Sequence, residues 1–211
     1  MNTTTSIKKW GLVLLVATFT AACNHAPPPK PASEVTPVTA ANTASSKRVA
    51  KAKTPGAVLQ NGSIQAVNDL EVDQPDGKKF KFANLKGNVI LVDVWATWCG
   101  PCREQTPKLA ALQQKYREQG LAVVGLSLDE KSDQAAVLDF MKQAGVNYPI
   151  AFASDKMSGA FLDGTEDETG AAPIPQIFII GKDGRVKEHL IGSDPNHSIA
   201  RIEEVITKEL N

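Results

Sequence analysis

The chain has 211 residues, with 23 basic and 23 acidic side chains and a formal net charge of zero. This balance gives no reason to expect nucleic acid as a partner or strong electrostatic steering. The length allows one folded domain and a tail. The three cysteines are Cys23, Cys99 and Cys102, so Cys23 is the only other intramolecular partner open to the Cys99–Cys102 pair.

The N-terminus has the pattern of an export signal. Two lysines precede an apolar run over residues 10–19, and small residues lead to Cys23. The run is shorter than the roughly 18–20 apolar residues of a membrane span, so it predicts a signal peptide over 1–22. Ala-Ala-Cys resembles the lipobox of bacterial lipoproteins, which implies that Cys23 is lipidated and anchors the chain to a membrane. The alternatives are an ordinary cleaved signal that leaves Cys23 as a free thiol and an uncleaved anchor.

The composition changes after this signal. Residues 23–57 are rich in Pro, Ala, Thr and Ser and contain neither aromatic side chains nor an apolar period. Such a segment buries no core, and we expect it to be a disordered linker behind the lipidated N-terminus. The folded domain is predicted over 58–211. Every exported form places this domain outside the cytoplasm, where conditions are generally oxidising.

The domain divides into short apolar segments and longer periodic ones. In chain order we predict a hairpin over 69–82, a strand over 89–95, a helix over 102–119, a strand over 121–128, a helix over 133–143, a strand over 148–153, a loop over 157–172, antiparallel strands over 177–180 and 185–191, and a helix from Ser193 or Asp194 to about Leu210. Strands alternating with helices, closed by a hairpin and a helix, indicate an α/β fold with a central mixed sheet flanked by helices.

The chemistry-bearing motif is Cys-Gly-Pro-Cys at 99–102, where the predicted strand runs into the predicted helix. Only a thiolate attacks a disulfide, and a helix N-terminus stabilises a thiolate. We therefore expect Cys99 to be the nucleophile and Cys102 to resolve the mixed disulfide. A structural disulfide is the first alternative, although so short a loop constrains little chain. A zinc site is the second, but His189 and His197 show no matching spacing, so no metal is expected.

Asp93 is a carboxyl group inside the apolar strand that precedes the motif. Burial without a partner raises the pKa of a carboxyl group. We expect Asp93 to accept the proton of Cys102, directly or through water. The alternative is a hydrogen-bonded Asp with a structural role only.

Several matched positions then identify a family. They are Trp98–Cys102, Pro107 inside the predicted helix, Ile174-Pro175 before an apolar strand and the Lys-Asp-Gly turn at 182–184. On these positions, residues 69–210 resemble the thioredoxin superfamily, in its exported, membrane-anchored TlpA-, ResA- and DsbE-like branch. The resemblance implies a thioredoxin-like fold with an N-terminal β-hairpin and an αβ insertion over 127–154.

The resemblance also implies a substrate surface. Pro175 is expected to be cis, which leaves the Ile174 backbone free to pair with an extended substrate segment. Trp98 is expected at the rim of this surface, and Trp95 in the core. The predicted substrate-binding residues are Trp98, Gly100, Pro101, Ile174 and Pro175. One departure is Gln176, which stands where Thr usually follows the cis-proline.

The resemblance implies a reductase of protein disulfides, because Gly-Pro between the cysteines accompanies reducing members. Its partners would be exported proteins with cysteine thiols or disulfides, apocytochrome c among them, and a membrane electron donor of the DsbD or CcdA type. We expect no cofactor, and we expect the chain to be a monomer. The alternatives are a disulfide isomerase or oxidase, or a client-binding lipoprotein whose dithiol is incidental.

Overall fold

The computed structural model describes residues 56–194 and 197–211. The predicted signal peptide, Cys23 and the linker up to residue 55 lie outside these residues. In the part of the chain that is described, no helix is both long and apolar enough to cross a membrane. The first helix, α1 (Ala57–Asn61), begins one residue before the predicted start of the domain.

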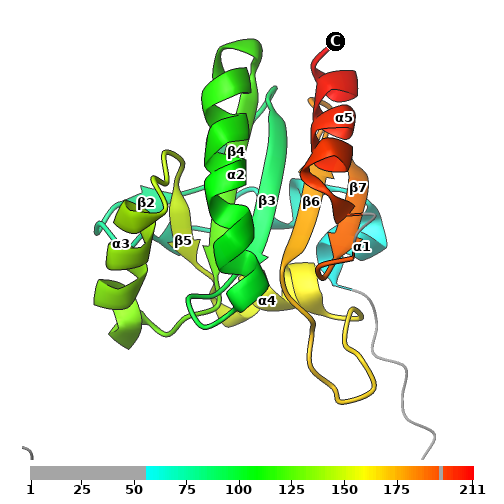
Figure 1. The fold of residues 1–211 in the computed structure, drawn as a ribbon. Coiled ribbons are helices and arrows are strands. Elements are labelled where there is room, and N and C mark those ends of the chain that lie inside the picture. The colour runs from blue at the N-terminus through cyan, green and yellow to red at the C-terminus, as the bar shows by residue number, and fades with distance from the viewer. Residues whose placement is uncertain (1–55, 195–196) are drawn as a thin grey trace, which may run out of the picture. The chain divides into compact units, whose positions relative to one another are not determined.

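A five-stranded mixed sheet forms the centre of the domain (Figure 1). Its strands are β3 (Val89–Trp95), β4 (Leu121–Ser127), β5 (Ile150–Phe152), β6 (Gln176–Ile180) and β7 (Val186–Ile191), in the spatial order β5-β4-β3-β6-β7. The strands β3, β4 and β5 are parallel, whereas β6 is antiparallel to both β3 and β7. Every residue of β3 and β4 is buried, which is typical of a sheet covered on both faces.

One face of the sheet carries α2 (Gly100–Tyr116) and α5 (Ile199–Leu210), with α3 (Gln134–Gln143) toward β5 (Figure 1). Leu91 and Trp95 of β3 point into this layer with Leu109 of α2 and Ile202 of α5. Because side chains alternate along a strand, Asp93 faces the same layer.

The opposite face is covered by α1, by α4 (Asp155–Leu162) and by an N-terminal hairpin. The hairpin pairs β1 (Val72–Asp73) with β2 (Lys79–Phe80), and Gly77 adopts φ 83° in its turn. Within the described residues there are also four 3-10 segments, at Ile64–Val67, Phe82–Leu85, Arg117–Gln119 and Lys131–Asp133. The hairpin and the insertion between β4 and β5 confirm both predicted additions to the core fold.

Helix α2 begins at Gly100, two residues before the predicted start. Cys99 is its N-cap and Pro101 lies in its first turn, where the missing proline N–H costs nothing. The α-helix ends at Tyr116, and a 3-10 turn continues to Gln119. Gly120 then reverses the chain at φ 99°, a backbone conformation open to glycine.

The segment over 157–172, which was predicted to be mostly loop, is a loop only from residue 163, because its first part belongs to α4. Ser154 caps this helix by accepting a hydrogen bond from the Met157 N–H at 3.3 Å. Met157 and Phe161 are fully buried one turn apart, so packing and the cap together stabilise the helix. The last helix, α5, begins later than the predicted Ser193 or Asp194. Its N-cap is Ser198, whose side chain accepts a hydrogen bond from the Arg201 N–H.

Candidate active site

The two cysteines of the motif lie at the N-terminus of α2 and are joined by a disulfide bond. The Cys99 sulfur accepts a hydrogen bond from the backbone N–H of Cys102 at 3.2 Å. Cys99 is 6% exposed and Cys102 is completely buried. Cys99 is therefore the sulfur closer to solvent, and it occupies the position where free N–H groups and the helix dipole favour a negative charge.

The loop before β6 reaches the same point from the other side. The Ile174–Pro175 peptide bond is cis, as expected, and Pro175 is buried. The Ile174 carbonyl oxygen lies 3.8 Å from the Cys99 sulfur. Two segments that are 75 residues apart in the sequence thus meet at one sulfur atom.

Three of the predicted substrate-binding residues are open to solvent around the disulfide. Trp98 is 70% exposed, and it is one of two large apolar side chains exposed among the described residues. Gly100 and Pro101 are exposed on the first turn of α2. Trp95, by contrast, is fully buried beneath them, as predicted. The exposed Trp98 ring thus offers one large apolar contact next to the reactive turn.

Asp93 lies in the middle of β3 and is 1% exposed. Among the described residues, neither oxygen of its carboxyl group has a hydrogen-bond partner. Burial raises the pKa of Asp93 to about 8, because removal from water disfavours the charged form. The group faces the layer that contains Cys102. A pKa of about 8 leaves about a tenth of the carboxyl group ionised at pH 7, and the ionised form can accept a proton.

Comparisons with known proteins agree with this geometry. The profile of the Redoxin family matches residues 54–206. The chain belongs to the Redoxin family. It is 37% identical over 133 residues to the thiol-disulfide oxidoreductase ResA of Bacillus anthracis. The aligned residues make up 63% of this chain and 69% of the relative.

Solved structures place the fold. A thiol:disulfide interchange protein of Chlorobium tepidum is 31% identical and superposes with a TM-score of 0.58, covering 67% of this chain and 93% of that one. A secreted disulfide oxidoreductase of Mycobacterium tuberculosis is 16% identical with a TM-score of 0.54, covering 66% and 95%, and shows the fold alone. The fold is thioredoxin-like, and the chain is a thiol-disulfide oxidoreductase.

Sequence reasoning singled out Gln176 only as a departure from the family pattern. The structure shows Gln176 fully buried behind the cis-proline. Its amide nitrogen donates to the Thr165 hydroxyl at 2.8 Å and to the Pro173 carbonyl at 3.0 Å. Its amide oxygen lies 2.8 Å from Nε2 of His189. Gln176 therefore ties the cis-proline loop to the segment before it and to β7.

His189 is held neutral by this environment. Its ring stacks on Phe178 with 4.1 Å between the ring centres. Burial lowers the pKa of His189 to about 4. A neutral ring that faces the Gln176 amide oxygen donates through Nε2–H, so this bond persists throughout the physiological pH range.

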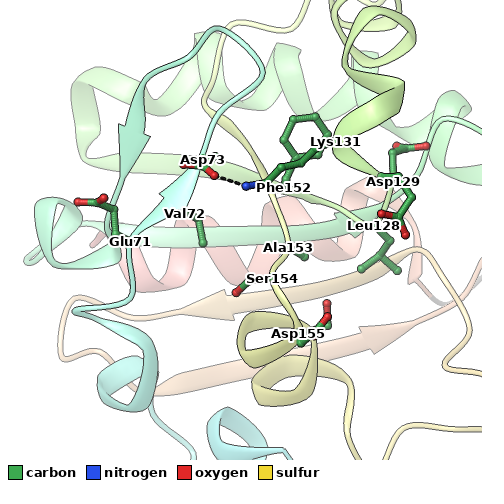
Figure 2. A pocket seen from close by; sticks show the side chains of 12 residues that line it. Glu71, Val72, Asp73, Leu128, Asp129, Lys131, Phe152, Ala153, Ser154 and Asp155 are labelled. Carbon is green, nitrogen blue, oxygen red and sulfur yellow. Dashed lines mark hydrogen bonds and ion pairs between the residues drawn. The ribbon is translucent and has the colours of Figure 1, made fainter.

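Figure 2 shows a pocket of about 400 Å³ on the hairpin side of the insertion. Asp129 lines it, together with Glu71, Asp155 and Lys131, which reaches across to an ion pair with Asp73. None of the predicted site residues lines this pocket. The Asp129 side chain lines this pocket and also accepts a hydrogen bond from the hydroxyl of Thr97, two residues before Cys99.

Proposed function

We propose that this chain is an extracytoplasmic reductase of protein disulfides that works through Cys99 and Cys102. The observation that carries the proposal is the position of the Cys99 sulfur. It is the N-cap of α2 and lies 3.8 Å from the carbonyl oxygen before the cis-proline. A thiolate there is stabilised by the helix and adjoins a backbone group that a substrate chain can bind.

The reaction begins with the reduced dithiol. The Cys99 thiolate attacks one sulfur of a substrate disulfide, forms a mixed disulfide, and releases the other substrate sulfur, which takes a proton. Cys102 then gives its proton, directly or through water, to the ionised fraction of Asp93 and attacks the Cys99 sulfur. The second substrate sulfur leaves as a thiolate and takes a proton from Asp93 or from water, and two electrons have passed from the chain to the substrate. The product is the Cys99–Cys102 disulfide that the structure contains.

The substrate segment binds across the cis-proline loop. The backbone of Ile174 pairs with an extended segment next to the attacked sulfur, in the manner of an added strand. Trp98 supplies apolar contact at the rim, and Gly100 and Pro101 leave the approach to Cys99 free of bulky side chains. Pro175 shapes the loop but donates no backbone hydrogen bond.

The reducing direction rests on the Gly-Pro dipeptide between the cysteines, which accompanies reducing members of the resembled superfamily. Protein dithiols of this type range from about −270 mV in thioredoxin to about −120 mV in DsbA. A reductant in an oxidising compartment needs an electron supply, so we propose a membrane donor of the DsbD or CcdA type. Exported cysteine-containing proteins are the proposed substrates, with the haem-binding cysteines of apocytochrome c as one candidate. The reduction potential of the pair tests the direction.

We further propose that Cys23 is lipidated and holds the domain at a membrane outside the cytoplasm. The support is the signal-like sequence before Cys23. In cells that express the full chain, the protein should sediment with membranes, and Cys23→Ala should move most of it to the soluble fraction. An unchanged membrane fraction for Cys23→Ala would show that lipidation of this residue is not the anchor.

A further inference from the structure

The turn that carries the reactive cysteine is residues 96–99, which we call the active-site turn. It is closed by the Cys99 N–H, which donates to the Ala96 carbonyl at 3.1 Å. Thr97 occupies its second position and is held from outside the turn. Its backbone N–H donates to the Asp129 carboxylate, with distances of 2.9 and 3.2 Å to the two oxygens. Its hydroxyl donates to Oδ1 of the same carboxylate at 2.6 Å.

The other side of the Thr97 peptide is held as well. The Arg103 guanidinium, from the first turns of α2, donates to the Thr97 carbonyl at 3.2 Å. The same guanidinium lies 4.8 Å from the ring centre of Phe140 in α3. Every polar group of Thr97 thus has a charged partner, and such bonds are roughly twice as strong as neutral ones.

Asp129 is itself fixed in place. It lies two residues after the end of β4 and is 8% exposed. The Ser127 hydroxyl donates to Oδ2 at 2.7 Å, and the Asp129 N–H donates back to that hydroxyl oxygen at 3.1 Å. A buried carboxylate with this many donors is a rigid acceptor, because each lost bond leaves a buried charge less compensated.

We propose that Asp129 is a positioning residue for the thiol chemistry and acts through Thr97 on Cys99. It fixes the active-site turn, and the turn keeps the Cys99 sulfur at the N-cap of α2. When the turn is loosened, the sulfur spends less time beside the Cys102 N–H, and its thiolate loses part of the stabilisation by the helix terminus. This inference rests on the proposed role of Cys99 as the nucleophile.

The test is the pH dependence of alkylation of Cys99 by iodoacetamide in the reduced chain, followed by mass spectrometry of the Cys99 peptide. Asp129→Ala should raise the midpoint by about half to one pH unit, which means about three- to tenfold less thiolate below the midpoint. Insulin reduction at neutral pH should slow by a smaller factor, because a thiol with a higher pKa is a stronger nucleophile once it is ionised. Asp129→Asn keeps an acceptor oxygen for Thr97 and should have a midpoint close to that of the wild type. If the negative charge of Asp129 alone determined the midpoint, Asp129→Asn and Asp129→Ala would shift it equally.

Glu130→Ala is the matched control. Glu130 is the next residue in the chain and is exposed, and its replacement by alanine removes the same negative charge. Its midpoint should equal that of the wild type. If Asp129→Ala does not fold, Thr97→Val tests the inference instead. This variant removes the hydrogen bond from the Thr97 hydroxyl to Asp129 and keeps the one from the Thr97 backbone N–H, so it should raise the midpoint of Cys99 alkylation by a smaller amount.

Two other results separate the inference from the function beneath it. A wild-type midpoint at about 8.5, the value of an ordinary thiol, overturns the activated Cys99 and the inference together. A lowered wild-type midpoint that stays unchanged in folded Asp129→Ala, or in Thr97→Val where that variant decides, overturns the inference alone.

Discussion

Replacement of Cys99 by serine should abolish the acceleration of insulin reduction by dithiothreitol. A serine hydroxyl is not ionised at neutral pH and forms no mixed disulfide, so the attacking step is lost. The contribution of the chain to the rate should fall on the order of a thousandfold or more, to the rate of dithiothreitol alone. The measurement is the onset of insulin turbidity with equal concentrations of wild type and variant.

Cys102→Ser is the matched variant, since it removes the other sulfur of the same disulfide. It keeps the attacking thiolate and removes the resolving one, so it should accumulate mixed disulfides with substrate that separate on a non-reducing gel. Full activity of Cys99→Ser would contradict the mechanism. Trapping by Cys99→Ser rather than by Cys102→Ser would reverse the assignment of the two roles.

Replacement of Asp93 by asparagine should remove a pH dependence of stability. Burial raises the pKa of Asp93 from about 3.9 in the unfolded chain to about 8. Between these values the folded chain binds about one more proton than the unfolded chain. The free energy of unfolding of the wild type therefore falls as pH rises, by about 1.4 kcal/mol per pH unit relative to Asp93→Asn.

From pH 5 to pH 7 this difference amounts to about 3 kcal/mol, and it levels off above the folded pKa. Urea unfolding of the oxidised proteins at pH 5, 6 and 7 measures it. Asp139→Asn, on the exposed side of α3, is the control and should follow the wild type. Parallel pH profiles for wild type and Asp93→Asn would show that the Asp93 carboxyl group is not protonated in the folded chain at neutral pH.

The residues that sequence reasoning placed at the site carry local signals. Cys99 and Cys102 follow a buried strand and open a helix, and both features are readable from the apolar run and the Gly-Pro pair. Asp93 stands out because it interrupts that run. The cis conformation at Pro175 came from the family resemblance, since the sequence alone gives little reason to expect it.

The residues that sequence reasoning missed act through tertiary contacts. Asp129 is one of several acidic residues after β4, and only the fold places it against Thr97, 32 positions away. Gln176 meets His189 because β6 and β7 pair in that register. Helix α4 was hidden by its polar and glycine residues, although Ser154 followed by buried Met157 and Phe161 is a readable cap and apolar spacing.

The reduction potential of the Cys99–Cys102 pair tests the proposed reductase most directly. The chain with Cys23→Ser is equilibrated against dithiothreitol or glutathione buffers, so that only this pair of thiols titrates. We expect a value near or below about −250 mV, which belongs to a reductant that depends on a membrane electron supply. A value above about −180 mV would contradict the account and assign the chain to disulfide formation or isomerisation.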